Sequence, residues 1–460
     1  MSKLPANQRT ALTVVCMSSF IMPMILSSVN VAIPTIATTF NADAIQISWV
    51  STAYLLASSV FLLPCGRLAD MKGRKRIYLY GMSTVIIASI LAATSTSIEV
   101  LIMWRVLQGI GAAMLFGTGV AILSTVFPPE ARGRALGINV SAIYFGLTCG
   151  PLFGGWVTQH LSWRAVFVIH VPIAIVVLVL AKLKLAGEFK GKPGQKLDVA
   201  GAFIYALTII SLMTGLSKLP EWQGVVLLLT SVASLVFFIR FERGLEHPLL
   251  DVKIFKGNRA LNFSCLASLT LYTSTFALTF VMSLYLQTIK GLSPQFAGAI
   301  MICQPMFMAL LSPTAGKLSD KLEPRYLTAG GMLSISIGLA LLTQLTPETA
   351  VGYILLCLSF TGLGFAMFSS PNTNAIMSSV DKANLGVASS AVSTTRVLGQ
   401  MFSMAVVTMA FAVVMGPLAI VPENNGFLLN AIKLSLSITT CLTIAGIYLS
   451  LARGNIRRAT

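Results

Sequence analysis

The sequence predicts an all-α, polytopic membrane protein with about fourteen transmembrane helices. Of its 460 residues, 55% are hydrophobic and only 10% are charged, whereas soluble domains carry roughly 25% charged residues. The apolar residues recur in blocks that are long enough to cross a bilayer. Lys and Arg gather on alternate connections between these blocks, which is the pattern that orients membrane helices.

A transmembrane helix needs about 20 predominantly apolar residues, and this length defines the predicted spans. In chain order they are residues 11–36, 46–66, 77–97, 100–127, 133–157, 164–186, 198–217, 223–240, 260–288, 294–316, 326–345, 350–379, 385–416 and 430–451. Several exceed the thickness of a bilayer, which allows them to tilt.

The basic residues assign sides to these spans. With a cytoplasmic N-terminus, 26 of the 32 Lys and Arg residues fall in cytoplasmic segments. The six others are Arg164, Lys218, Lys290 and Lys433 in outer segments and Arg105 and Arg396 within spans. One span more or fewer would destroy the alternation, so we expect a plasma-membrane protein with both termini in the cytoplasm. The net charge of +17 is therefore a topology signal and not the footprint of a nucleic-acid-binding surface.

Two polar connectors, residues 184–197 and 241–259, divide the chain. We expect an N-terminal six-helix bundle in residues 1–190, two linker helices in residues 191–245 and a C-terminal six-helix bundle in residues 246–460. A short repeat favours two related halves, because Gly66-Arg-Leu-Ala-Asp70 in the first resembles Gly316-Lys-Leu-Ser-Asp320 in the second. The seven cysteines lack disulfide or zinc spacing, so we expect them to be packing residues and expect no metal site.

The connection after the second span carries the most informative motif. Residues 66–76 read GRLADMKGRKR and resemble the GxLaDrxGrkr loop of the major facilitator superfamily. Residues 101–111 resemble the RxxqGxg motif of that family's fourth helix, and residues 146–155 resemble the gxxxGPxxGG motif that marks exporters. Residues 30–36 and 162–172 are similar to signatures of the fourteen-helix drug:proton antiporter branch. The resemblance covers the whole chain and implies a secondary transporter.

The resemblance assigns a conformational latch to the loop after the second span. Its expected residues are Gly66, Asp70, Gly73, Arg74 and Asp320. Gly73 permits the tight turn, and a carboxylate at a helix N-terminus is electrostatically favourable. In the family Asp70 would cap the helix that here begins near Asn384, and Asp320 would make the mirrored contact near Arg132. The alternative is a solvated basic turn that topology alone requires.

Two arginines lie inside predicted spans, where an unpaired charge is costly. Arg105 has Gln108 one turn further along the same helix face, and Arg396 shares a polar stripe with Ser393 and Gln400. We expect both arginines to line a central cavity and to serve substrate binding or coupling. The alternative is a structural pairing with backbone carbonyls.

The fifth span carries glycines at four-residue spacing, which clears one helix face for close packing. The residues of this expected antiporter seam are Gly146, Gly150, Pro151, Gly154 and Gly155. Pro151 removes a backbone donor and favours a kink. Candidate substrate-binding residues are the intramembrane polar residues Asn30, Tyr54, Gln304 and Asn374, each of which also suits a contact between helices.

One position departs from the antiporter branch. The first helix of that branch usually carries an acid five residues before its Asn-Val-Ala-hydrophobic-Pro stretch, and here that position is Ile25. All fifteen acidic residues fall at span ends or in connections. The departure puts both a preference for cationic drugs and the usual proton site in question. His170, near the outer end of the sixth span, is the remaining titratable candidate for proton coupling.

These patterns predict a secondary active transporter that exports lipophilic small molecules by alternating access, as in proton-coupled multidrug efflux. We expect a monomer that uses the proton gradient, binds no cofactor or nucleic acid, and works on a small-molecule substrate in a lipid bilayer. The alternative is a transporter of one anionic or neutral metabolite, which the two intramembrane arginines favour. A remote alternative, a membrane-embedded enzyme, needs a nucleophile, base or metal cluster inside the spans, and the sequence has no such grouping.

The topology has a direct test. A cysteine introduced at position 190 or 457, in a background without the seven native cysteines, should not react with a membrane-impermeant maleimide added to intact cells. Both positions should react after the cells are opened. Labelling of either position from outside would contradict the fourteen-span topology.

Overall fold

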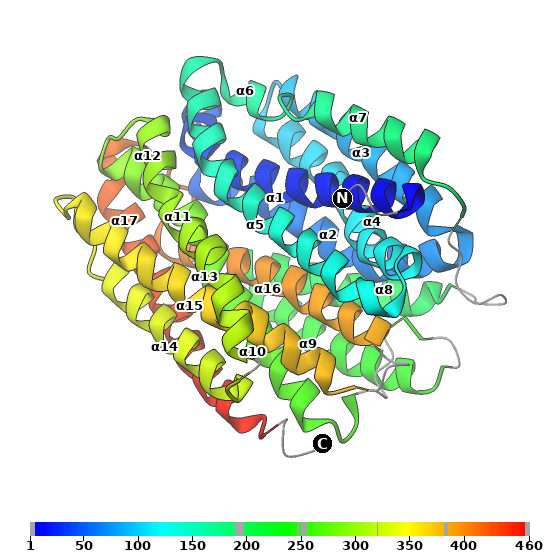
Figure 1. The fold of residues 1–460 in the computed structure, drawn as a ribbon. Helices are drawn as coiled ribbons and strands as arrows, with labels where there is room; N and C mark the ends of the chain where they lie inside the picture. Colours follow the sequence, from blue (N-terminus) through cyan, green and yellow to red (C-terminus); the bar gives the residue numbers. More distant parts are fainter. Residues whose placement is uncertain are drawn as a thin grey trace.

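The computed structural model describes residues 5–188, 197–245, 248–249, 255–319, 321–380 and 385–455. These residues contain 14 helices that are long and apolar enough to cross a membrane (Figure 1). Each corresponds to one predicted span, so the predicted fold class and span count are confirmed. Asp320 and Asn384, which belong to the expected latch contacts, lie outside the described residues.

The helices before residue 190 form the first group. They are α1 (Ala6–Phe40), α2 (Ala44–Lys72), α3 (Arg74–Ala93), α4 (Ile98–Val126), α5 (Pro129–His160), α6 (Trp163–Val166) and α7 (Val171–Lys184). Within this group α1 packs on α5, α2 packs on α4, and α3 packs on α4 and α7.

The helices after residue 254 form the second group. They are α10 (Arg259–Thr275), α11 (Leu278–Leu284), the π-helix η2 (Tyr285–Ile289), α12 (Pro294–Met301), α13 (Cys303–Ser319), α14 (Pro324–Leu342), α15 (Val351–Ser378), α16 (Leu385–Val414), the 3-10 helix η4 (Pro422–Asn424) and α17 (Asn425–Ala452). Here α15 packs on α13 and α14, and α10 packs on α16 and α17.

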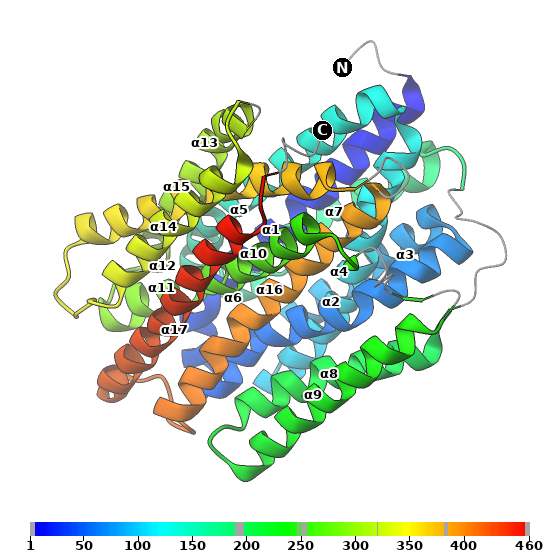
Figure 2. The ribbon, with the colours of Figure 1, turned by 90° about the horizontal axis from the view of Figure 1, so that it is seen from below.

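Between the groups, α8 (Val199–Ser217) and α9 (Trp222–Arg243) form an antiparallel hairpin. In Figure 2 the hairpin lies along the outside of the bundle. It packs through α8 against α2 of the first group and α16 of the second. The Tyr205 hydroxyl donates to the Ser59 carbonyl of α2 at 3.2 Å, while many apolar side chains of α8 and α9 are exposed, as expected for a lipid-facing surface.

The number of spans is even, so α1 begins on the side of the bundle where α17 ends (Figure 2). We call this side the terminal face and the other the opposite face. On the opposite face α2 begins with a capping box, in which the Asp43 carboxylate accepts from the Gln46 amide at 2.7 Å. On the terminal face α2 ends at Gly73, whose φ of +112° is a conformation that favours glycine.

Three predicted spans are interrupted helices. The sixth consists of α6 and α7, the ninth of α10, α11 and η2, and the tenth of α12 and α13. In the ninth, the Ala277 amide donates to the Ser403 hydroxyl of α16 at 2.9 Å. An interrupted backbone is tolerated at membrane depth only where other groups satisfy its hydrogen bonds, and Ser403 does so here.

Glycines set the distance between α5 and α1. A Cβ at Gly146 would lie 2.2 Å from the Phe20 carbonyl oxygen, and one at Gly154 would lie 2.6 Å from Cα of Ser28. No side chain fits in that space, so the four-residue glycine spacing brings the two backbones together. The Ser28 hydroxyl donates to the Gly150 carbonyl at 2.8 Å. Such close packing is what holds helices together in lipid.

The two groups are in close contact where α5 meets α12. A Cβ at Gly155 would lie 2.4 Å from the Pro294 carbonyl oxygen, and one at Gly298 would lie 2.2 Å from the Pro151 carbonyl oxygen. The face of α5 that carries Gly154 therefore packs on α1 of its own group, whereas the adjacent Gly155 packs on α12 of the other group. The structure places Gly155 and Pro151 at the boundary between the groups.

Hydrogen bonds between the groups gather toward the opposite face. The hydroxyl groups of Ser48 and Thr408 are hydrogen-bonded, with their oxygens 3.1 Å apart. The side-chain amide of Gln287 donates to the Val31 carbonyl at 2.8 Å. Nearer the middle, Tyr144 of α5 is hydrogen-bonded to Ser369 of α15. The two groups are thus joined at the opposite face, which is closed in this conformation.

Candidate functional site

A cavity with about 890 Å³ of empty space lies between the two groups. Its walls come from α1, α2, α4 and α5 of the first group and α10 and α16 of the second. We call it the first cavity; it lies near the middle of these helices, away from the contacts that close the opposite face.

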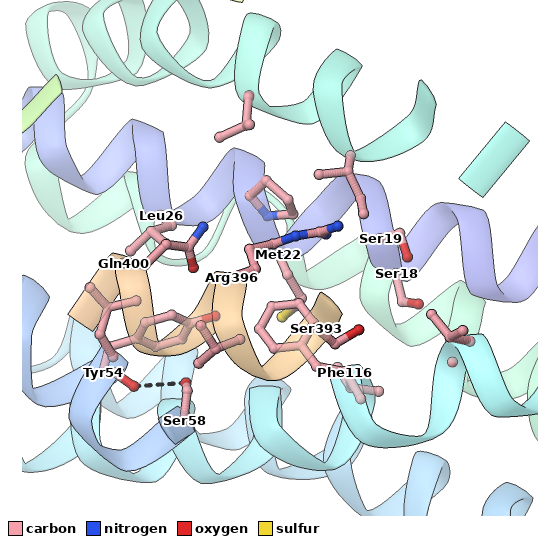
Figure 3. A pocket seen from close by; sticks show the side chains of 18 of the residues that line it. Ser18, Ser19, Met22, Leu26, Tyr54, Ser58, Phe116, Ser393, Arg396 and Gln400 are labelled. Atoms are coloured by element: carbon pink, nitrogen blue, oxygen red, sulfur yellow. Dashed lines mark hydrogen bonds between the residues drawn. The ribbon is translucent and has the colours of Figure 1, made fainter. Parts of the chain in front are cut away.

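Arg396 is the charged residue of the first cavity. Figure 3 shows its side chain extending from α16 toward α1, with Gln400 and Ser393 of the same stripe beside it. The guanidinium lies 5.8 Å from the ring centroid of Tyr272, and its buried Nε has no hydrogen-bond partner among the described residues. The structure therefore places Arg396 where the sequence predicts it, with hydrogen-bonding capacity left for a ligand.

Asn139 of α5 also lines the first cavity, and sequence analysis missed it. Its side chain is 3% exposed, and its Oδ1 has no partner in the described part of the chain. A buried amide without a partner is costly, so this atom is available to a ligand. An asparagine inside the fifth span was the one sequence signal that could have identified it.

Arg105 does not line a cavity, contrary to the expectation from sequence. Its side chain is fully buried, and its Nε donates to the Val50 carbonyl of α2 at 2.9 Å. The ring of Tyr54, which does line the first cavity, lies 4.5 Å from the guanidinium. Tyr54 thus covers Arg105 on the cavity side, and pairing with a backbone carbonyl, the alternative weighed from sequence, describes its contacts.

A hydrogen-bonded chain extends from Arg105 through the first group. Arg105 Nη1 donates to Gln108 Oε1, and Gln108 Nε2 donates to the Ser89 hydroxyl at 2.7 Å. The Ser89 hydroxyl lies 3.1 Å from Nε2 of His170, which is 1% exposed. The chain joins α2, α4, α3 and the start of α7, so Gln108 and His170 support the Arg105 site and do not line either cavity.

A second cavity, with about 620 Å³ of empty space, adjoins the first. It is lined by α1, α5, α10, α11, α12, α13, α15 and α16. It shares Leu26, Leu147, Phe276 and Gln400 with the first cavity. The predicted binding residues Asn30 and Gln304 line it. The Asn30 carbonyl also accepts from the Ser51 hydroxyl at 2.8 Å, so Asn30 joins helices as well as facing the cavity.

Asn374 lies outside both cavities, so this candidate is not at the site in this conformation. Its amide donates to the Ser319 hydroxyl at 2.9 Å and thereby joins α15 to α13. The burial of a third arginine was also unforeseen. Arg453, just past the end of α17, is 2% exposed and donates to the Asn372 carbonyl oxygen at 2.9 Å. Sequence analysis counted it among the basic residues of the cytoplasmic segments, which fits its place at the end of α17.

The latch loop contains an ion pair. Arg74 Nη2 lies 2.8 Å from Asp70 Oδ1. Arg74 Nη1 also donates to the Thr125 hydroxyl, at the end of α4, at 2.7 Å. These contacts remain within the first group. The contact expected between Asp70 and the helix near Asn384, and that expected of Asp320, involve residues outside the described ranges and stay predictions.

The buried chain around Arg105 generates a stability prediction. Gln108→Leu replaces the glutamine by an apolar side chain of similar size. It removes the Oε1 acceptor and leaves the Arg105 Nη1 donor unpaired in the interior. Loss of a hydrogen bond to a charged group costs about 1.5–3 kcal/mol, so the midpoint of thermal unfolding of the purified protein should fall by several degrees. Gln344→Leu changes an exposed glutamine and should leave it unchanged. Equal midpoints for Gln108→Leu and wild type would show that the chain does not stabilise the fold.

Comparison with known proteins agrees with this geometry. The chain is 30% identical over 388 residues to the riboflavin transporter RibZ of Clostridioides difficile, covering 84% of each chain. It is 31% identical to the cephamycin export protein CmcT of Amycolatopsis lactamdurans, covering 86% of this chain and 84% of that protein, and 28% identical to the multidrug resistance protein Stp of Mycobacterium tuberculosis, covering 82% and 71%.

Solved structures share the fold. A bacterial homologue of the human lysosomal transporter Spinster superposes with a TM-score of 0.71 at 15% identity and 97% coverage of both chains. The D-xylose–proton symporter superposes with a TM-score of 0.67 at 16% identity. Residues 15–404 match the Major Facilitator Superfamily. The chain therefore belongs to the Major Facilitator Superfamily and is a multi-pass membrane transporter, not an enzyme.

Proposed function

We propose that the protein exports neutral, zwitterionic or anionic lipophilic molecules from the cytoplasm, driven by the proton gradient. The observation that carries the proposal is the charge of the central site. Arg396 lines the first cavity, and no Asp or Glu is among the described residues that line either cavity. Ile25, at the position of the usual first-helix acid, is buried in α1 with 3% exposure. A cation would find no counter-charge in such a site, and its desolvation would be uncompensated.

The conformation supports export by alternating access. The contacts between the groups close the opposite face, so the cavities are presented toward the terminal face. With both termini in the cytoplasm, as the basic residues predict, this is the state in which an exporter loads its substrate. The groups would then rock about the α5–α12 contact to open the other side. We propose that a single chain, in the plasma membrane, completes this cycle.

The relatives support export and leave a second candidate. Two relatives are named for cephamycin export and for multidrug resistance, and both roles suit efflux of lipophilic compounds. Another relative is named a riboflavin transporter. Together with Arg396, this favours transport of a single neutral or anionic metabolite as the second candidate. Competition among unrelated substrates separates the two, because a multidrug site admits many compounds and a metabolite site admits one.

The preferred substrate charge can be measured in inverted membrane vesicles that are acidic inside. Uptake of an anionic dye should exceed uptake of an ethidium-like cation of similar size and should stop when a protonophore collapses the gradient. Arg396→Gln removes the charge but keeps hydrogen-bonding capacity. It should therefore reduce anionic uptake about tenfold, equivalent to about 1.4 kcal/mol, and neutral uptake much less.

Arg240→Gln provides the matched control, because Arg240 is exposed on the α8–α9 hairpin. That variant should take up both dyes as the wild type does. Faster uptake of the cation than of the anion by the wild type would refute the proposed charge preference. Uptake that survives the protonophore would refute the proposed coupling to protons.

The latch makes a separate prediction about turnover. Asp70→Asn loses a partly exposed ion pair, which contributes at most about 1 kcal/mol to stability, so the protein should fold and insert. If Asp70 stabilises the outward-facing state, transport should fall at least about tenfold, since that requires only about 1.4 kcal/mol. Glu221→Gln, at an exposed helix end on the opposite face, should transport normally. Wild-type transport by Asp70→Asn would mean that the loop only sets topology.

A further inference from the structure

We propose that the second cavity is a subsite for a flat, fused-ring aromatic group, and that the first cavity holds an anionic or hydrogen-bond-accepting end of the same molecule. The substrate class is thus an amphiphile with a planar ring system at one end and an acceptor at the other. This inference rests on the proposed function and adds the shape of the substrate to its charge.

Aromatic rings form one wall of the second cavity. Tyr272 of α10 and Phe365 of α15 pack edge to face, with ring centroids 5.6 Å apart and an interplanar angle of 76°. Both line the empty space although they are only 9% and 5% exposed. Phe276, one turn beyond Tyr272, lines the same space. Their positions are fixed from two helices, so the wall exists before a ligand arrives.

Another part of the lining is adaptable. Met301, Pro305 and Met308 of α12 and α13 line the second cavity. Thioether side chains are flexible, and their sulfur atoms make favourable contacts with aromatic rings. A space bounded by fixed rings and by flexible methionines suits a rigid planar group, because the methionines can adjust to its thickness while the rings provide aromatic contacts.

Polar groups stand where the two cavities meet. Gln400 lines both cavities, and Arg396 of the first cavity lies over the Tyr272 ring of the second. In the described part of the chain the buried Nε of Arg396 and Oδ1 of Asn139 have no partner. A ligand with its rings beside Tyr272 would therefore place its other end next to Arg396, which donates hydrogen bonds in a planar fork that matches a carboxylate.

The two cavities adjoin, so one extended ligand can reach both. They are joined through the shared lining residues Leu26, Leu147, Phe276 and Gln400. A molecule that filled the second cavity alone would not contact Arg396. One that extends across both cavities can contact the aromatic rings and the guanidinium together.

A matched pair of acids tests the subsite. Anthracene-2-carboxylate and its fully hydrogenated analogue have the same carbon skeleton and charge, but only the first is planar and aromatic. We expect the purified full-length protein in lipid nanodiscs to bind the aromatic acid about tenfold more tightly, as measured by equilibrium dialysis. Only that acid is planar and can make aromatic contacts with the rings of the cavity wall. Phe365→Leu and Tyr272→Leu should each remove most of this difference.

Phe368→Leu is the control, since Phe368 lies on the same helix, is 1% exposed and lines neither cavity. It should keep the tenfold preference. If the wild type binds both acids equally, the planar subsite is refuted while anion recognition stands. If the wild type binds neither, the proposed function fails and the subsite fails with it. If Phe365→Leu does not fold, Tyr272→Leu decides, and an unchanged preference in that variant overturns the proposal.

Discussion

Close backbone approach at α5 is the constraint on which the transporter depends. Lipid provides no hydrophobic drive between helices, so their association relies on packing and hydrogen bonds. At Gly146 and Gly154 the approach fixes α5 to α1 within one group, and at Gly155 it brings α5 against α12 of the other. Helix α5, which lines both cavities, is therefore also one of the helices along which the groups touch. A side chain at Gly155 would separate the groups at the opposite face, whereas the glycines toward α1 hold the first group together while it moves.

Three arginines lie inside the bundle, and no Asp or Glu is among the described residues that line its two cavities. Arg105 is enclosed by the Val50 carbonyl, the Gln108 amide and the Tyr54 ring. Arg453 is likewise held by neutral oxygen atoms, among them that of Asn372. Arg396 differs because it lines the first cavity. Arg105 and Arg453 thus hold helices together, and Arg396 is left to contact a ligand.

The number of helices could be predicted from sequence because lipid imposes both length and polarity on each span, and each predicted span has its counterpart. The direction of a side chain could not. Arg105 and Arg396 are equivalent as isolated arginines in apolar helices, and only the helices packed around them distinguish them. Tyr54 covers Arg105 on the cavity side, whereas Arg396 itself lines the first cavity. For the same reason Asn374 was a candidate for substrate binding, although its partner is Ser319. The contacts of Arg453 with α10, α14 and α15 were likewise not foreseen.

The α8–α9 hairpin has a consequence for the route by which substrates reach the site. A two-group transporter has two lateral seams, one between α2 and α16 and one between α5 and α13. The hairpin lies over the first, because α8 packs against α2 and α16. The second has no such cover among the described helices, and its flank exposes large apolar residues such as Phe145 and Met306. The hairpin thus makes the transporter asymmetric toward the lipid, and a molecule dissolved in the membrane has one seam, not two, through which to approach.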